Sequence, residues 1–311
     1  MPSVRGFQAL LAGASVLALA SGCGRRPAPA RHKTTQPAPA QAASIFEGQH
    51  GAGPAESAQA SNAPERKNTE PLIVAKVEER SLPSASGALP LRIYTPAGNG
   101  AALPVIVYFH DGGSSENSGT HDTVARALAN DTPALVVAME LPKMPPPKPV
   151  EQGVAIATEG ATDVYRWVLK NADSLHGDAR RVALVGEGGG GNVAEKVAIW
   201  ARDQRQQQPL HVVLVCPDAS GLLKTKLVGL PETTIINAEI DPLEPDGKRL
   251  TERLALAEVQ VKQKTYVRMT HDFFGLSVGE ARDARQFASE RLRQSFDAAS
   301  RGEKTVSGGG S

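Results

Sequence analysis

The chain has 311 residues, of which 41% are hydrophobic and only 4% aromatic, and its formal net charge is +1. This apolar content is enough for a sizeable core, while the near-neutral charge gives no electrostatic sign of a nucleic-acid or polyanionic partner. A chain of this length can hold two average domains or a single larger α/β domain, so the pattern along the sequence has to decide.

The first 23 residues have the organisation of an export signal. Arg5 supplies a positive charge, and residues 10–20 form an apolar stretch too short to remain as a membrane span. The sequence ASGC at residues 20–23 resembles the bacterial lipobox, whose cysteine is acylated and becomes the new N-terminus. We therefore expect a lipid anchor at Cys23 that holds the protein in the bacterial cell envelope, facing the periplasm. Gly24 slightly favours the outer membrane, and ordinary secretory cleavage nearby is the alternative.

Composition divides the rest of the chain into three parts. Residues 24–70 are rich in Ala, Pro, Gln, Ser and Gly, so they bury too little apolar surface to offset their ordering entropy and are predicted to form a disordered tether. Residues 71–300 are predicted to form the folded domain. Residues 301–311 are predicted to form a loose polar end.

Apolar runs of strand length alternate with longer stretches of helical periodicity in the folded part. This alternation predicts an α/β protein, with a mostly parallel eight-stranded sheet and helices on both faces. The strands are expected at 73–79, 89–94, 105–110, 134–139, 181–185, 211–216, 233–238 and 264–269. The helices are expected at 121–129, 153–172, 192–206, 247–259 and 279–298.

A glycine-rich turn, GEGGGGN at residues 186–192, follows one predicted strand and opens the next helix. A turn of this kind projects one residue over the sheet edge, beside the positive end of the helix dipole. It also satisfies G-x-G-x-x-G, but a dinucleotide fingerprint belongs to the first βα unit and has an acidic residue ending the next strand. Here several strands precede it, and the next one ends at Cys216 and Pro217. We interpret the turn as an elbow and predict neither a cofactor nor a metal.

With its flanks, RVALVGEGGGGNVA at residues 181–194, the turn resembles the nucleophile elbow of the hormone-sensitive-lipase-like esterases and lipases. These are α/β-hydrolases (fold-3) whose motif is G-D-S-A-G-G-N. Four further stretches match the family in its order along the chain: LRIYTP at 91–96, PVIVYFHDGG at 104–113, DPLEPDG at 241–247 and MTHDFF at 269–274. The resemblance implies an α/β-hydrolase fold from about residue 79 to residue 296.

The resemblance also implies the roles of individual residues. It assigns the acid role to Asp241 and the base role to His271, and a histidine oriented by a buried carboxylate can move a proton near neutral pH. The backbone N–H groups of Gly112, Gly113 and Gly189 are expected to stabilise the negative charge that develops on a carbonyl oxygen, because glycine leaves the approach unobstructed.

The main departure from the family is Gly188, which aligns with the nucleophilic serine and offers no attacking atom. Ser114 and Ser115 lie beside the oxyanion loop and are interpreted as turn residues. Only about a dozen residues separate Pro217 from Leu230, where the family places part of a helical cap over the acyl chain. The cap is therefore predicted to be reduced or absent, which puts a lipase activity in doubt.

These features lead to three hypotheses about function. The first is an esterase-like pseudoenzyme that binds a small ester- or acyl-like ligand or acts as a scaffold, with the membrane as its other partner through the anchor and no nucleic acid. The second is a weak or atypical esterase or amidase in which His271 activates water. The third is a purely structural envelope lipoprotein. Cys216, in an apolar run, is interpreted as a buried hydrophobe without a disulfide partner.

Overall fold

The computed structural model describes residues 72–85, 87–98, 101–110, 118–141, 150–219 and 221–302. Cys23, Gly112, Gly113, Ser114 and Ser115 lie outside these ranges, as do most of the two predicted terminal segments. Within the described residues, eight strands form one sheet in the order β1-β2-β4-β3-β5-β6-β7-β8. β2 pairs antiparallel with β1 and with β4, and every other pair in the sheet is parallel.

The element bounds follow the predicted alternation of strands and helices. The strands are β1 (Lys76–Ser84), β2 (Gly87–Thr95), β3 (Leu103–His110), β4 (Leu135–Glu140), β5 (Gly177–Glu187), β6 (His211–Val215), β7 (Glu232–Ile240) and β8 (Val261–Thr270). The helices are α1 (Ser118–Asp131), α2 (Val150–Asn171), α3 (Gly189–Asp203), α4 (Glu244–Leu256) and α5 (Gly279–Ser300), with short 3-10 turns η1 (Ala172–Leu175) and η2 (His271–Gly275).

Among the described elements, β1 differs most from its predicted position. It was expected at 73–79 but lies at Lys76–Ser84, where it pairs with β2 from Lys76 opposite Thr95 to Ser84 opposite Gly87. No β1 residue is fully buried, so its own apolar residues do not set its bounds. The register with β2 sets them instead, because a hairpin strand extends as far as its partner can pair.

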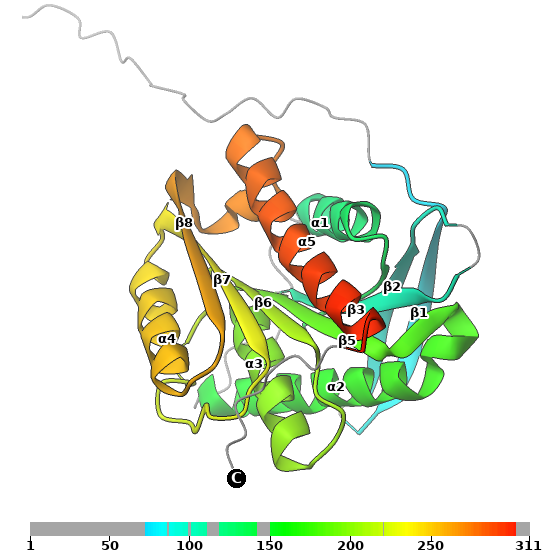
Figure 1. Cartoon of the computed structure of the whole chain (residues 1–311), viewed down its shortest axis with the longest axis horizontal. Helices are drawn as coiled ribbons and strands as arrows, with labels where there is room; N and C mark the ends of the chain where they lie inside the picture. The colour runs from blue at the N-terminus through cyan, green and yellow to red at the C-terminus, as the bar shows by residue number, and fades with distance from the viewer. Residues whose placement is uncertain are drawn as a thin grey trace, which may run out of the picture. The chain divides into compact units, whose positions relative to one another are not determined.

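Helices cover both faces of the sheet (Figure 1). α1 and α5 lie on one face and α2, α3 and α4 on the other, and each face has its own cluster of buried apolar side chains. β3 shows the division: Val107 and Phe109 belong to the α2–α3 side, while Ile106 and Tyr108 belong to the α1–α5 side. Successive side chains of a strand point to opposite faces, so a strand covered on both is apolar throughout.

The connection between β6 and β7 is short, as the sequence predicts. In its described part, which leaves out residue 220, the chain makes turns and no helix or strand. This stretch therefore places no helical cap above the carboxyl ends of β5, β6 and β7. None of the helices in the described ranges is both long and apolar enough to cross a membrane.

Candidate active site

The turn after β5 is held by backbone hydrogen bonds to the end of β6. Gly188 has φ 55° and ψ −121° and caps the N-terminus of α3. Its N–H donates to the carbonyl of Val215 at 2.9 Å, and its own carbonyl accepts from the N–H of Asp218 at 3.2 Å. Glycine reaches this positive φ without the steric cost that a Cβ would add. The predicted elbow is therefore present, with a bare backbone at its tip.

Two further glycines let the helix after the turn approach the sheet. A Cβ on Gly186 would lie 2.3 Å from the carbonyl oxygen of Gly190, and a Cβ on Gly190 would lie 2.3 Å from the carbonyl oxygen of Phe109. Neither contact leaves room for a side chain. The start of α3 thus packs directly against the ends of β5 and β3, which places Gly189, the first residue of α3, at the carboxyl end of the sheet.

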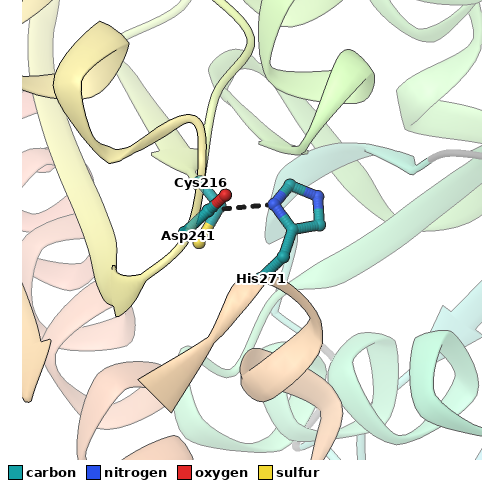
Figure 2. Close-up of side chains that lie close together, drawn as sticks. All are labelled: Cys216, Asp241 and His271. Carbon is teal, nitrogen blue, oxygen red and sulfur yellow. Dashed lines mark hydrogen bonds and ion pairs between the residues drawn. The ribbon is translucent and has the colours of Figure 1, made fainter. Parts of the chain in front are cut away.

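Asp241 and His271 form a hydrogen-bonded pair at the ends of β7 and β8 (Figure 2). Nδ1 of His271 lies 2.9 Å from Oδ2 of Asp241, and Oδ1 of Asp241 accepts from the N–H of Leu243 at 2.9 Å. The Asp241 side chain is 1% exposed, while that of His271 is 36% exposed. A buried carboxylate therefore orients an imidazole that solvent can reach, and a proton held on Nδ1 leaves Nε2 free to accept one.

Cys216 also lies at this site, although its apolar surroundings in the sequence predict only a buried core residue. It follows β6, has φ 45°, and is a buried free cysteine. Burial, followed by the neighbouring carboxylate of Asp241, raises the pKa of its thiol well above the ordinary value. The thiol is therefore protonated at neutral pH, so Cys216 is not poised as a nucleophile, which would have to be a thiolate. The sequence signal that could have pointed to Cys216 is its position between an apolar strand and Pro217, at the carboxyl end of that strand.

A second polar cluster lies beside the elbow. Tyr108 donates a hydrogen bond to the carboxylate of Glu187, and its hydroxyl oxygen lies 3.3 Å from Nδ1 of His121. The rings of His110 and His121 stack with their centroids 4.0 Å apart. Burial, and next the charge of His110, lower the pKa of His121 to about 4, so its imidazole is neutral at neutral pH. Tyr108, His110 and Glu187 lie in the family-like motifs, whereas His121 lies outside them. The cluster connects the end of β5, through Glu187, to β3 and α1.

Sheet order explains why these groups meet. β5, β6, β7 and β8 are consecutive neighbours, and their carboxyl ends carry Gly188, Cys216, Asp241 and His271. Carboxyl ends of parallel strands meet at one edge of a sheet, where ligands of open α/β folds bind. An elbow into a helix, followed in chain order by an acid and then a histidine, is the arrangement of the α/β-hydrolase class.

Comparisons with known proteins agree with this class. The sequence profile of a family described as alpha/beta hydrolase fold matches residues 106–226 and 218–275. Carboxylesterase NlhH of Mycobacterium tuberculosis is 30% identical over 260 residues, which are 67% of this chain and 79% of that protein. The chain belongs to the alpha/beta hydrolase fold-3 family, the hormone-sensitive-lipase-like carboxylesterases.

Two other matches carry different functional names. A hyperthermophilic esterase from the archaeon Pyrobaculum calidifontis has a TM-score of 0.63 and 25% identity, with 71% of this chain and 84% of that chain covered. Gibberellin receptor GID1C of Arabidopsis thaliana is 32% identical over 133 residues, which are 41% of this chain and 37% of that protein. The chain is thus similar both to esterases and to a protein named as a receptor.

Proposed function

We propose that this protein is a catalytically impaired relative of the carboxylesterases that binds a small ester- or acyl-like ligand. The observation that carries the proposal is Gly188, which stands at the turn between β5 and α3 and has no side chain to attack a carbonyl. The family motif aligns its serine with this position. Loss of one triad member leaves an acceleration over water of about 10³–10⁴-fold in proteases, so slow residual hydrolysis is compatible with this function.

The rest of the site suits binding. The buried carboxylate of Asp241 orients the half-exposed imidazole of His271, which presents a polar group towards solvent. The N–H groups of Gly112, Gly113 and Gly189 are proposed to receive a carbonyl oxygen, although the first two lie outside the described residues. GID1C provides a precedent, because a protein named as a receptor is similar to this chain over part of its length.

The proposal places this binding domain at the bacterial envelope. The lipobox-like sequence that ends at Cys23 supports acylation of that residue, and residues 24–70 would then connect the anchor to the folded domain. The membrane is thus a proposed partner through the anchor, with the outer membrane preferred, and nucleic acid is not.

A second function, weak hydrolysis of small esters or amides, is favoured by the Asp241–His271 hydrogen bond. A neutral imidazole whose Nδ1–H is held by a carboxylate can take a proton from water through Nε2, so that water attacks the carbonyl directly. This route forms no covalent enzyme intermediate. It therefore predicts that the protein does not react with fluorophosphonate probes.

The experiment is hydrolysis of short p-nitrophenyl esters by the full chain and by its Gly188→Ser variant. We expect the unmodified protein to stay near the background rate and the variant to gain about 10³-fold and to react with a fluorophosphonate, because serine restores the covalent route. Gly279→Ser is the matched control, since a Cβ at Gly279 meets nothing within 4 Å. It should gain no activity.

Two results would contradict the proposal. Robust hydrolysis by the unmodified protein that disappears in His271→Ala would show an active enzyme. A folded Gly188→Ser variant that neither hydrolyses esters nor reacts with the probe would show that residue 188 does not stand at the position of the nucleophile.

A further inference from the structure

We propose that Cys216, Asp241 and His271 bind a divalent metal ion of the zinc class, with one coordination position left open. Each of the three side chains offers one ligand atom, and these atoms all lie within 4.8 Å of one another (Figure 2). Thiolate, imidazole and carboxylate are the ligands that Zn²⁺ takes in proteins, and three protein ligands with an open fourth position are typical of catalytic sites. No other group of this kind occurs among the described residues.

The spacing of the ligand atoms is close to that of a tetrahedral site. Zn–S bonds of about 2.3 Å and Zn–N or Zn–O bonds of about 2.0–2.2 Å place neighbouring ligand atoms about 3.3–3.6 Å apart. Asp241 and His271 are slightly closer than this, at 2.9 Å, and the sulfur lies within 4.8 Å of both. A coordination sphere of this size would require the ligand atoms to shift by about 1 Å from these separations. The half-exposed ring of His271, on the short turn η2, is the ligand best able to move.

The other two ligands are held by their surroundings. The N–H of Leu243 donates to Oδ1 of Asp241, which leaves Oδ2 for a metal. The N–H of Cys216 donates to the carbonyl of Ile236 in β7 at 2.8 Å. Contacts of this kind orient the ligands of metal sites and contribute strongly to their affinity. Because the three ligands follow three neighbouring strands, the sheet positions them before any metal arrives.

Charge balance suits a divalent ion once the thiol has lost its proton. A thiolate and a carboxylate supply two negative charges and a neutral histidine supplies none, so a divalent cation makes the site neutral. Cys216 is 2% exposed and the Asp241 side chain 1%, and two buried anions without a cation would be costly. Without metal the thiol keeps its proton; the metal replaces that proton, which is released to solvent.

This inference goes beyond the proposed function, since metal binding does not require that residue 188 stand at the nucleophile position. It would nevertheless give the site a Lewis acid where the family has serine. The site is next to the elbow: Gly188 donates to the carbonyl of Val215, the residue before Cys216. A ligand carbonyl or carboxylate, or a water molecule, could then occupy the open position.

The test is a titration of the chelator-treated full chain with Co²⁺, which reports its ligands through its absorption, followed by competition with Zn²⁺. We expect one equivalent of Co²⁺ to give the intense visible bands of a tetrahedral ion together with a thiolate-to-cobalt charge-transfer band, and Zn²⁺ to abolish both. Cys216→Ala should remove the charge-transfer band. His271→Ala should weaken the affinity at least about 100-fold, because loss of a ligand exceeds the 10–100-fold effect of its supporting contacts.

The controls separate this site from other binding groups on the chain. Cys23→Ser removes the only other cysteine and should leave the spectrum unchanged. His176→Asn removes an exposed histidine at a left-handed position that asparagine tolerates, and it should leave the affinity unchanged. Circular dichroism checks that each variant is folded, and His271→Ala, at a half-exposed turn, keeps the test open if Cys216→Ala unfolds.

Three outcomes would overturn the proposal: no binding of Co²⁺, binding without a thiolate band, or an affinity unchanged in folded His271→Ala. Since no ester hydrolysis is measured, these outcomes are independent of the behaviour of Gly188→Ser. A failure of metal binding and a failure of the proposed function can therefore be told apart.

Discussion

The elbow and the Asp241–His271 pair, the proposed acid–base pair, are the two halves of the proposed site, and they are built from different parts of the chain. At the elbow the contacts are backbone contacts: Gly188 is held by Val215 and Asp218, and Gly190 lies against the carbonyl of Phe109. At the other half, the contact joins the side chains of Asp241 and His271, one buried and one half-exposed.

This difference between backbone and side-chain contacts indicates which half of the proposed site is the better guide to function. Close packing of α3 on the sheet preserves the elbow whether or not a nucleophile is present, so its shape reports folding. Burying a carboxylate against an imidazole gains little stability over apolar packing of the same volume. The acid–base pair therefore points more strongly to a ligand, a proton or a metal than the elbow does.

The largest expected effect comes from a substitution in the Asp241–His271 pair of a chain that carries Gly188→Ser. In the Gly188→Ser background, Asp241→Asn should abolish the gain of about 10³-fold in kcat/KM for p-nitrophenyl esters, because an amide no longer holds the catalytic tautomer of His271. Asp246→Asn, which changes the other acid of the same motif, is the matched control and should retain the gained rate. Equal rates of hydrolysis in the Asp241→Asn and Asp246→Asn variants would show that Asp241 does not take part in the reaction.

The next effect tests whether the elbow is fixed by packing. Gly190→Ala places a Cβ 2.3 Å from the carbonyl oxygen of Phe109, and backbone on both sides cannot give way easily. We expect a loss of about 3–4 kcal/mol in the free energy of unfolding, measured with urea. Gly279→Ala, where a Cβ meets nothing within 4 Å, should change the stability by less than about 0.5 kcal/mol. A tolerated Gly190→Ala would mean that α3 can shift away from β3.

The smallest effect concerns a buried acid in the helix that follows the elbow. Glu195 is fully buried in α3, and its carboxylate oxygens have no hydrogen-bond partner within the described part of the chain. Burial raises its pKa to about 7 from 4.5, partly opposed by the charge of Arg202. Its contribution to stability is therefore complete below pH 4.5 and is lost as the pH rises through 7.

Glu195→Gln should remove this loss, since glutamine stays neutral. The free energy of unfolding of the variant, minus that of the unmodified protein, should rise by about 2–3 kcal/mol between pH 4.5 and pH 8. Urea unfolding at both pH values measures this difference. Glu159→Gln, at an exposed position in α2, should show no such difference. If Glu195→Gln shows no such pH-dependent difference either, the ionised carboxylate of Glu195 must form a hydrogen bond with another group or with water.

The sequence by itself determined the class of fold and pointed to the residues of the proposed site. Within the described residues, seven of the eight strands and the five helices lie within a few residues of their predicted ranges, because the local spacing of apolar residues reflects which faces are buried. The exception is β1, which begins and ends later in the chain than predicted. Asp241 and His271 followed from motifs in the family order, and Gly188 from its alignment with serine. The structure contains the Asp241–His271 hydrogen bond and the turn at Gly188, and the roles of these residues stay predictions.

Only the tertiary structure decided which distant side chains meet. The register with β2 moved β1 by several residues, and strand order placed Cys216 beside Asp241 and His271, 25 and 55 positions further along the chain. Tyr108 and Glu187 likewise come together because β3 and β5 are neighbours. Sheet neighbours depend on pairing across the whole domain, and no local pattern of residues records that pairing.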